Sequence, residues 1–261
     1  MSGLGLPPEL LFLIPMAFVA GFVDAVVGGG GLIQIPALFL AYPQASPAAL
    51  FGTNKLASIC GTSVAAWRYL RGVAVPWNGA LPAVAAARVA GYGGAAAVSL
   101  MPRECMRPIV MVLQELVALY TLRRRDFGSV HAPRLGPAAE RWMGAVVGAV
   151  IGFYDGFFGP GTGAFLIFAF VRIFGYDFLA ASACAKLVNW ITNFAALAYF
   201  GATGNVVWLV AAGMAAANVG GAALGSRLAL AKGSPFVRRF FLVVLSLMIA
   251  RLGWDTVQAW F

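Results

Sequence analysis

The stretch GFVDAVVGGGG, residues 21–31, decides the organisation of this chain because it returns in altered form as GFYDGFFGPGTG, residues 152–163. Aligning the two copies places Gly21 on Gly152 and, at the same offset, Asp24 on Asp155. Each copy joins an apolar run to a cluster of glycines, and such clusters interrupt helices. Because the motif returns about half a chain length later, it predicts an internal duplication.

A second pair of rare residues keeps the same register. The offset that places Asp24 on Asp155 also places Lys55 on Lys186, and a leucine follows each lysine. Charged residues inside apolar segments are costly and usually have a function. Chance explains matching glycines, but it does not easily explain an Asp and a Lys that both match. We therefore predict two structural repeats.

The composition indicates a membrane protein. Of the 261 residues, 61% are hydrophobic and 10% are charged, whereas soluble domains have roughly 45–50% apolar and about 25% charged residues. Apolar runs of about 20 residues, long enough to cross a bilayer as a helix, recur along the chain. Residues 1–20 lack the basic start of a signal peptide, so we expect an uncleaved first membrane segment. We attribute the net charge of +9 to arginines in cytoplasmic loops and not to nucleic-acid binding.

Each repeat contains four apolar segments. In the first repeat, residues 1–126, they lie near 10–42, 48–70, 78–100 and 106–122. In the second repeat, residues 142–261, they lie near 142–174, 179–200, 205–226 and 237–257. A basic polar linker, residues 127–141, joins the repeats. The predicted fold is an all-α membrane protein of two repeats, each of which opens with a glycine-broken helix.

The first segment of each repeat has about 33 residues, or about 50 Å of helix, which is more than one crossing needs. It is either one tilted span or a re-entrant hairpin that returns to its starting side. If every segment crosses once, the basic residues divide seven to seven between the two sides. With two hairpins they divide twelve to three, a strong positive-inside bias. The larger group is Arg68, Arg71, Arg123, Arg124, Arg125, Arg134, Arg141, Arg172, Arg227, Lys232, Arg238 and Arg239, and the smaller is Arg103, Arg107 and Arg251.

The hairpin interpretation has a consequence for symmetry. Three true crossings remain in each repeat, so the second repeat enters the membrane with opposite polarity and both termini lie outside. We therefore favour an inverted repeat with a re-entrant first segment in each half.

The glycine breaks are the first candidates for a binding site. Non-helical backbone at membrane depth is tolerated only inside protein or beside a water-filled cavity, and paired breaks mark the sites of many transporters. The helix that starts after each break presents unpaired N–H groups to an anion. The candidate substrate-binding residues are Gly28, Gly29, Gly30 and Gly31 in the first repeat and Gly159, Gly161, Thr162 and Gly163 in the second.

The matched charges are the second candidates. Lys55 and Lys186 either bind an anion from two sides, or each neutralises the aspartate of its own repeat, Asp24 or Asp155. The same aspartates are candidate counter-ions or coupling residues for a proton or Na⁺. Polar residues near the lysines that could bind an oxyanion are Thr53, Asn54, Asn189 and Asn193. Arg88 either contacts the substrate or pairs with Glu115 in the next segment.

The sequence resembles the TauE/SafE family, the sulfite-exporter-like membrane permeases of bacteria. The resemblance rests on GFVDAVVGGGGLIQIPAL and GTNKLAS in the first half, and on GFYDGFFGPGTG and AKLVN in the second. It implies a multi-pass anion permease of the bacterial cytoplasmic membrane. It further implies sulfite, sulfoacetate or another organosulfur or organic anion as the substrate. The second half has Ala185 where the first has Asn54, so the two lysines are not expected to act alike.

The leading function is a secondary transporter for a small anion. The sequence contains no GxxxxGK[ST] phosphate loop for ATP-driven transport. The alternatives are an anion channel and a membrane-embedded enzyme, which would need His, Cys or paired carboxylates near one membrane surface. The single histidine, His131, lies in a loop, and the three cysteines have no CxxC spacing. We therefore expect no enzyme, metal or cofactor. The expected partners are the lipid bilayer and the anion, and the oligomeric state stays open.

Overall fold

The computed structural model describes residues 8–100 and 132–260, and every regular element in this part is a helix. The half of the chain predicted to be the first repeat, which keeps that name below as the other half keeps the name second repeat, contains α1 (Pro8–Val27), α2 (Gly31–Ala41), α3 (Pro47–Gly72) and α4 (Trp77–Ser99). These helices coincide with the first three predicted segments, and the fourth, near 106–122, lies outside the described residues. Ser46 starts α3 because its hydroxyl accepts a hydrogen bond from the amide of Ala49 (3.2 Å).

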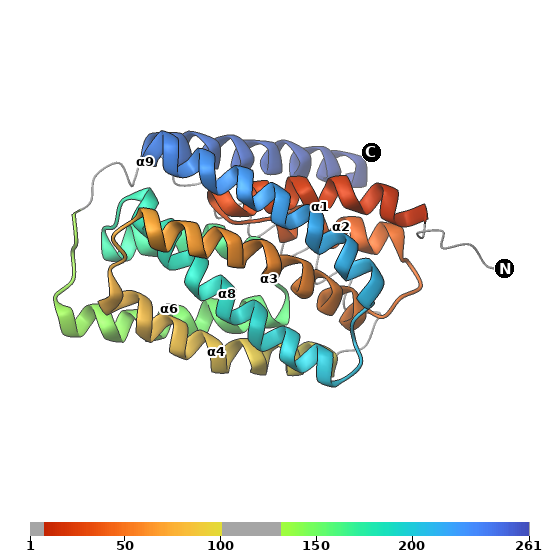
Figure 1. Cartoon of the computed structure of the whole chain (residues 1–261), viewed down its shortest axis with the longest axis horizontal. Coiled ribbons are helices and arrows are strands. Elements are labelled where there is room, and N and C mark those ends of the chain that lie inside the picture. The colour runs from red at the N-terminus through yellow and green to blue at the C-terminus, as the bar shows by residue number, and fades with distance from the viewer. Residues whose placement is uncertain (1–7, 101–131, 261) are drawn as a thin grey trace.

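The second repeat contains α6 (Pro137–Phe157), α7 (Thr162–Ala169), a π-helical turn η1 (Phe170–Phe174), α8 (Phe178–Ala202) and α9 (Trp208–Trp260). Asp177 caps α8 as Ser46 caps α3, by accepting hydrogen bonds from Leu179 and Ala180. The long α9 breaks at Gly233, where φ is 73°. Its two parts match the predicted segments near 205–226 and 237–257, and the second part doubles back along the first (Figure 1).

One boundary differs from the sequence analysis. The predicted linker ran to residue 141, but α6 already begins at Pro137. Proline suits the first helical position because its fixed φ fits a helix and its missing N–H has no partner there. The first turn also holds Glu140, a charge that the positive end of the helix stabilises.

The first segment of each repeat is a hairpin and not a single straight span. After the break at residues 28–30, α2 runs back beside α1, and its Ala37 and Leu38 join an apolar cluster with Leu10 and Leu13 (Figure 1). In the second repeat the returning arm ends at Tyr176. The Tyr176 hydroxyl donates a hydrogen bond to a carboxylate in the first turn of α6, that of Glu140.

The first helix of each repeat packs mainly on the other repeat. The first helix of each repeat lies along the third helical segment of the other, so α6 packs on α4 and α1 packs on α9. Small residues let the backbones approach closely. In the α4–α6 contact they are Gly144, Gly148, Gly152 and Gly156 of α6, which face Gly79, Ala83, Ala87 and Gly91 of α4.

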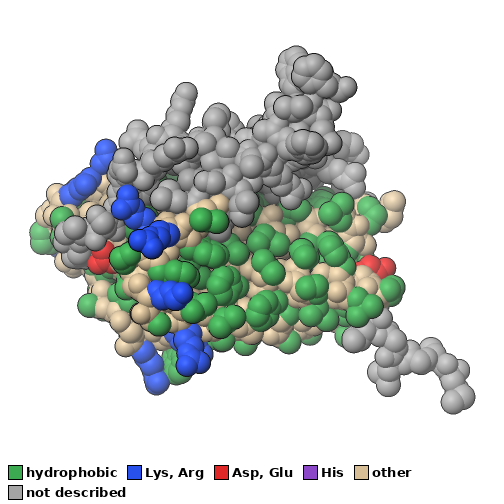
Figure 2. Space-filling model, turned by 90° about the horizontal axis from the view of Figure 1, so that it is seen from above, with side chains coloured by type: hydrophobic (Ala, Val, Ile, Leu, Met, Phe, Trp, Pro, Cys, Tyr) green, Lys and Arg blue, Asp and Glu red, His purple; other side chains and the backbone are tan. Residues whose placement is uncertain are grey.

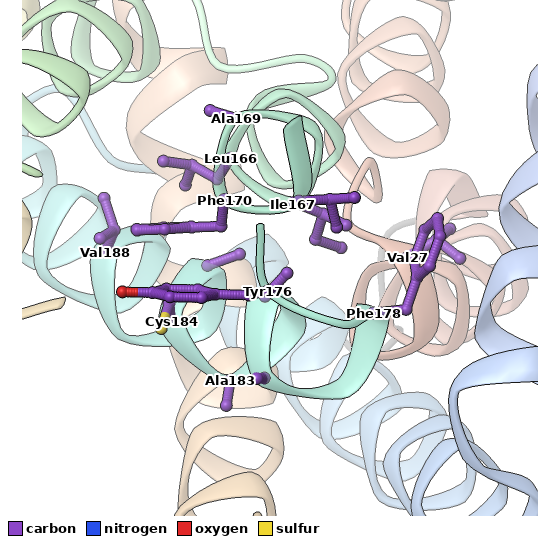
Figure 3. Packing of buried hydrophobic residues seen from close by; sticks show 14 of the residues in the cluster. Val27, Leu166, Ile167, Ala169, Phe170, Tyr176, Phe178, Ala183, Cys184 and Val188 are labelled. Atoms are coloured by element: carbon purple, nitrogen blue, oxygen red, sulfur yellow. The ribbon is translucent and has the colours of Figure 1, made fainter. Parts of the chain in front are cut away.

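A large apolar cluster fixes the returning arm of the second hairpin (Figure 3). The rings of Phe170 and Tyr176 stack at 6.0 Å with an angle of 8° between their planes. Cys184 and Val188 of α8 lie in the same cluster and are fully buried. This packing holds α7 and η1 between α6 and α8, which sets the position of the break that precedes them.

On the face shown in Figure 2 the described surface is largely apolar along its length and basic at one end. By length and composition α1, α4 and the Trp208–Phe241 part of α9 can each cross a membrane. Arg134 donates a hydrogen bond to the main-chain oxygen of Arg172 (3.1 Å), which ties the start of the second hairpin to its end. A single-span model would place these two arginines on opposite sides.

Candidate functional site

The two glycine breaks meet at the centre of the molecule. A Cβ atom on Gly28 would clash with the backbone of Gly163, and one on Gly163 would clash with Gly28. Gly28 also has a φ of 71°, a conformation that other residues rarely adopt. The tips of the two hairpins are therefore in backbone contact, and glycine is required at that contact.

Two ion pairs cross between the repeats. The Nζ atom of Lys55 lies 3.0 Å from Oδ2 of Asp155 and donates to the Asp155 main-chain oxygen at 2.7 Å. Lys186 lies 3.4 Å from Oδ2 of Asp24 and also donates to the Asp24 main-chain oxygen. The alternative in which each lysine neutralises the aspartate of its own repeat is therefore wrong. The aspartate at the tip of each hairpin instead pairs with the lysine of the other half.

The pairs are deeply buried, but not equally. The side chains of Lys55 and Asp155 are 3% and 2% exposed, whereas those of Lys186 and Asp24 are 0% and 17% exposed. A buried charge is tolerated when it has a partner and further hydrogen bonds. The second contact of each lysine, to the main-chain oxygen of the same aspartate, supplies such a bond.

A polar cavity of about 290 Å³, counting space open to solvent, lies between the hairpin tips and the lysine-bearing helices α3 and α8. Both repeats contribute a tip and a helix. Its lining residues are Asp24, Gly29, Gly31, Asn54, Lys55, Ser58, Asp155, Gly159, Thr162, Gly163, Asn189 and Asn193.

Two helices begin at this cavity with unbonded amides. Within the described residues, the N–H groups of Gly30 and Gly31 at the start of α2 have no hydrogen-bond acceptor. The same holds for Gly163 and Ala164 at the start of α7. Free N–H groups and the positive end of the helix dipole together favour a negative charge.

Comparison with known proteins fits this architecture. The family model for the sulfite exporter TauE/SafE matches residues 13–252. The chain belongs to the TauE/SafE family. YfcA, a probable membrane transporter protein of Escherichia coli K12, is 36% identical to it over 251 residues, which cover 96% of this chain and 91% of YfcA.

Other relatives of this TauE/SafE chain carry similar names. A probable membrane transporter protein of a Sinorhizobium species, ORF9, is 34% identical over 93% of the chain and 92% of its own length. One from Haemophilus influenzae is 32% identical over 97% of the chain and 96% of its own length. No solved structure matches significantly. The family and these names support a membrane transporter, and they point away from an enzyme.

The structure brings most of the predicted site residues of this TauE/SafE chain together. Gly28, Gly30, Gly161 and Lys186 lie directly behind the cavity-lining residues, at the breaks or bonded to Asp24. Thr53 lies elsewhere, because its hydroxyl accepts a hydrogen bond from Val207 at the start of α9 (2.9 Å).

Arg88 is not part of this cavity. Its side chain is exposed on α4, whereas Ala87 and Gly91 face α6. Because side chains one position apart on a helix point in different directions, a face of small residues that packs on α6 turns Arg88 outward. Its alternative partner, Glu115, lies outside the described residues.

The sequence analysis missed Ser58 as a site residue. Ser58 lines the cavity one turn after Asn54, and the repeat offset places it on Asn189. Asn193 continues the same face of α8 one turn further and donates a hydrogen bond to Asn189 (3.3 Å). The offset could therefore have identified Ser58 once Asn189 was chosen.

In the described residues no group of three or more His, Cys, Asp or Glu is placed to hold a metal ion.

Proposed function

We propose that this protein is a secondary transporter for a small anion, and that sulfite, sulfoacetate or another organosulfur or organic anion binds in the central cavity. The observation that carries the proposal is the convergence of two helix N-termini, with free amides at Gly31 and Gly163, on a cavity lined by Lys55. Oxyanions are the ligands that such amides and an ammonium group bind best.

The donors at the cavity remain available to a ligand. An ammonium group has three N–H donors, and the two contacts of Lys55 both go to Asp155. The side-chain amide of Asn54, whose buried oxygen has no hydrogen-bond partner among the described residues, adds the two N–H donors of its nitrogen. Lys55 and Asn54 line the cavity from α3, and Asn189 lines it from α8.

The crossed packing supports an inverted repeat in a bacterial inner membrane. Under this proposal the second hairpin enters from the basic side, which is cytoplasmic by the positive-inside rule, and the first hairpin enters from the opposite side (Figure 1). Each crossed ion pair joins a hairpin tip of one repeat to a helix of the other. Rocking one repeat against the other opens the cavity to alternate sides while the site itself stays between the repeats.

The proposal is tested by flux measurements on purified protein in proteoliposomes. Radiolabelled sulfite, sulfate, thiosulfate, sulfoacetate and simple carboxylates are offered, and uptake is measured with and without unlabelled anion inside. A transporter shows saturable uptake that internal anion accelerates by exchange. Flux that follows voltage without exchange would instead identify an anion channel, and no flux of any of these anions would refute the proposal.

Asn54→Leu tests whether this cavity is the binding site. Leucine has the same number and branching of side-chain heavy atoms as asparagine, and the substitution breaks no side-chain hydrogen bond of Asn54 in the described structure, so the fold should survive. Loss of polar contacts worth about 1–3 kcal/mol should raise the KM for the transported anion about tenfold or more. Arg88→Gln is the matched control, since Arg88 lies outside the cavity, and it should keep the wild-type KM. A normal KM in Asn54→Leu would place the site elsewhere.

A further inference from the structure

The cavity is electrically balanced before an anion enters. Lys55 opposes Asp155, and Lys186 opposes Asp24, so the two lysines and two aspartates sum to zero. An anion therefore adds a negative charge to a buried site that holds no spare positive charge, which is unfavourable in a low dielectric. A positive charge that arrives together with the anion removes this imbalance.

The two carboxylates are held in different ways. Asp24 accepts hydrogen bonds from the amide of Gly29 (3.3 Å) and the hydroxyl of Thr62 (3.5 Å) in addition to its contact with Lys186. In the described part of the chain, the carboxylate of Asp155 has only Lys55 as a partner. Its Oδ2 atom is buried and lacks the geometry of a hydrogen bond even to that lysine.

This asymmetry originates in the sequence. The repeat offset places Pro160 where the first repeat has Gly29, and proline has no N–H to donate. It also places Asn193 where the first repeat has Thr62. The Asn193 side chain donates to Asn189 instead of to the aspartate. Both donors that support the ionised form of Asp24 are therefore absent around Asp155.

We propose that Asp155 is the coupling residue and that it takes up one proton for each anion bound. The inference rests on the proposed function and specifies its coupling ion. When an anion approaches, Lys55 keeps its proton and turns from Asp155 to the anion. A proton from water then binds to a carboxylate oxygen of Asp155, which has lost its only partner. When the anion leaves, the proton returns to water and the ion pair forms again.

Asp24 stays ionised throughout this cycle. If Lys186 moves away from it, the Gly29 amide and the Thr62 hydroxyl still stabilise its negative charge. The surroundings of Asp155 provide no competing acceptor of the proton. The titratable and charged groups on the described elements around it are Lys55, Cys60, Arg68, Tyr69 and Arg71 of α3; Cys184, Lys186 and Tyr199 of α8; Glu9 and Asp24 of α1; Glu140, Arg141 and Tyr154 of α6 itself; Arg172 of η1; and Arg88 and Tyr92, exposed on α4.

The hydroxyl of Tyr154 and the carboxylate of Glu140 are both engaged in hydrogen bonds. The Tyr154 hydroxyl donates to the main-chain oxygen of Pro160 at 2.6 Å. Glu140 lies in the first turn of α6, far from the break, and accepts the hydrogen bond of Tyr176. The carboxylate that faces the cavity from the second repeat is therefore Asp155 alone among the described residues.

The test uses proteoliposomes with the membrane potential clamped at zero and a pH gradient that is acidic outside. The probes are labelled thiosulfate and sulfoacetate, which hold no exchangeable proton near pH 7. One proton per anion predicts that the accumulation ratio rises about tenfold for each pH unit. Asp155→Asn, which resembles the protonated carboxyl, should exchange anions more slowly, because Lys55 loses its charged partner, and should accumulate none in response to the pH gradient.

Asp24→Asn is the matched control. It should lower uptake, because Lys186 loses its partner, but the remaining uptake should keep the pH dependence. Accumulation driven by a Na⁺ gradient at equal pH, or unchanged pH coupling in Asp155→Asn, would overturn the inference. Exchange of these anions by the wild type without any proton uptake would overturn the inference alone. Absence of exchange for every anion of the panel would overturn the proposed function as well.

Discussion

Lys55 and Lys186 connect the two halves of the molecule through single side chains. Each ammonium group contacts both the carboxylate and the main-chain oxygen of an aspartate in the other repeat. The main-chain oxygen of Asp155 has no backbone donor among the described residues, because the amides of Phe158 and Gly159 both donate to Tyr154, so Lys55 satisfies an acceptor that the helix break leaves open. The lysines thus stabilise the breaks as well as the charges, and removing one has a structural cost in addition to any loss of transport.

The crossed pairing predicts the outcome of a charge exchange. Lys55→Ala should lower the stability by about 3–5 kcal/mol, because Asp155 would remain buried without a partner. The exchanged pair Lys55→Asp with Asp155→Lys should regain a large part of that stability. The control exchange within one repeat, Lys55→Asp with Asp24→Lys, should regain none.

Thermal unfolding of the purified variants in detergent measures these differences as a double-mutant cycle. A coupling between Lys55 and Asp155 that does not exceed the coupling between Lys55 and Asp24 would contradict the crossed arrangement. Flux is a poor readout for the single lysine variants, because misfolding and loss of the site both abolish it.

At the scale of elements, the packing of each hairpin against its neighbouring helices requires the helix backbones to approach closely. The α4–α6 contact has glycine or alanine at four successive turns of each helix. Small residues permit dense packing where lipid offers no hydrophobic driving force for helix association. The break at residues 158–161 is held in place from both sides, by this contact and by the apolar cluster around η1.

Two adjacent glycines of α4 test this interpretation. A Cβ atom on Gly94 would lie 2.7 Å from the Phe157 amide nitrogen at the end of α6, whereas one on Gly93 would meet nothing within 4 Å. Gly94→Ala should therefore lower stability by about 1–3 kcal/mol through overpacking. Gly93→Ala should raise it by up to about 1 kcal/mol through helix propensity. Equal melting temperatures for the two variants would show that α4 and α6 do not pack in this register.

The elements were largely predictable from the sequence, but their partners were not. The offset between the repeats identified the breaks and the lysine helices because these depend on local residue types. Pairing across the repeats depends on how the hairpins interlock, and no local pattern encodes it. The orientation of Arg88 was predictable in part, since Ala83, Ala87 and Gly91 mark the packed face of its helix.

At the scale of the whole molecule, most of the exposed basic residues lie at one end and both ends of the described chain lie at the other. The described basic residues outside the core gather at one end, where α3 ends, α6 begins and α9 bends (Figure 2); the exceptions are Arg88 on the side of α4 and Arg251 on the returning part of α9. The first residue of α1 and the last of α9 lie together at the opposite end (Figure 1). In the proposed topology, the positive-inside rule predicts that the basic end is cytoplasmic and that both chain ends lie outside.

Cysteine accessibility in intact cells tests this orientation. In a variant whose own cysteines are replaced, single cysteines are placed at Ala139, Arg172 and Ala202, which are exposed in the structure. Ala139 lies in the first helical turn of the second hairpin and Arg172 near its end, both at the basic end, whereas Ala202 ends α8 at the other. A membrane-impermeant thiol reagent should label only the cysteine at 202 until the membrane is permeabilised. Labelling of 172 from outside, with 139 protected, would mean that the segment crosses the membrane once, and the hairpin topology and inverted repeat would both have to be abandoned.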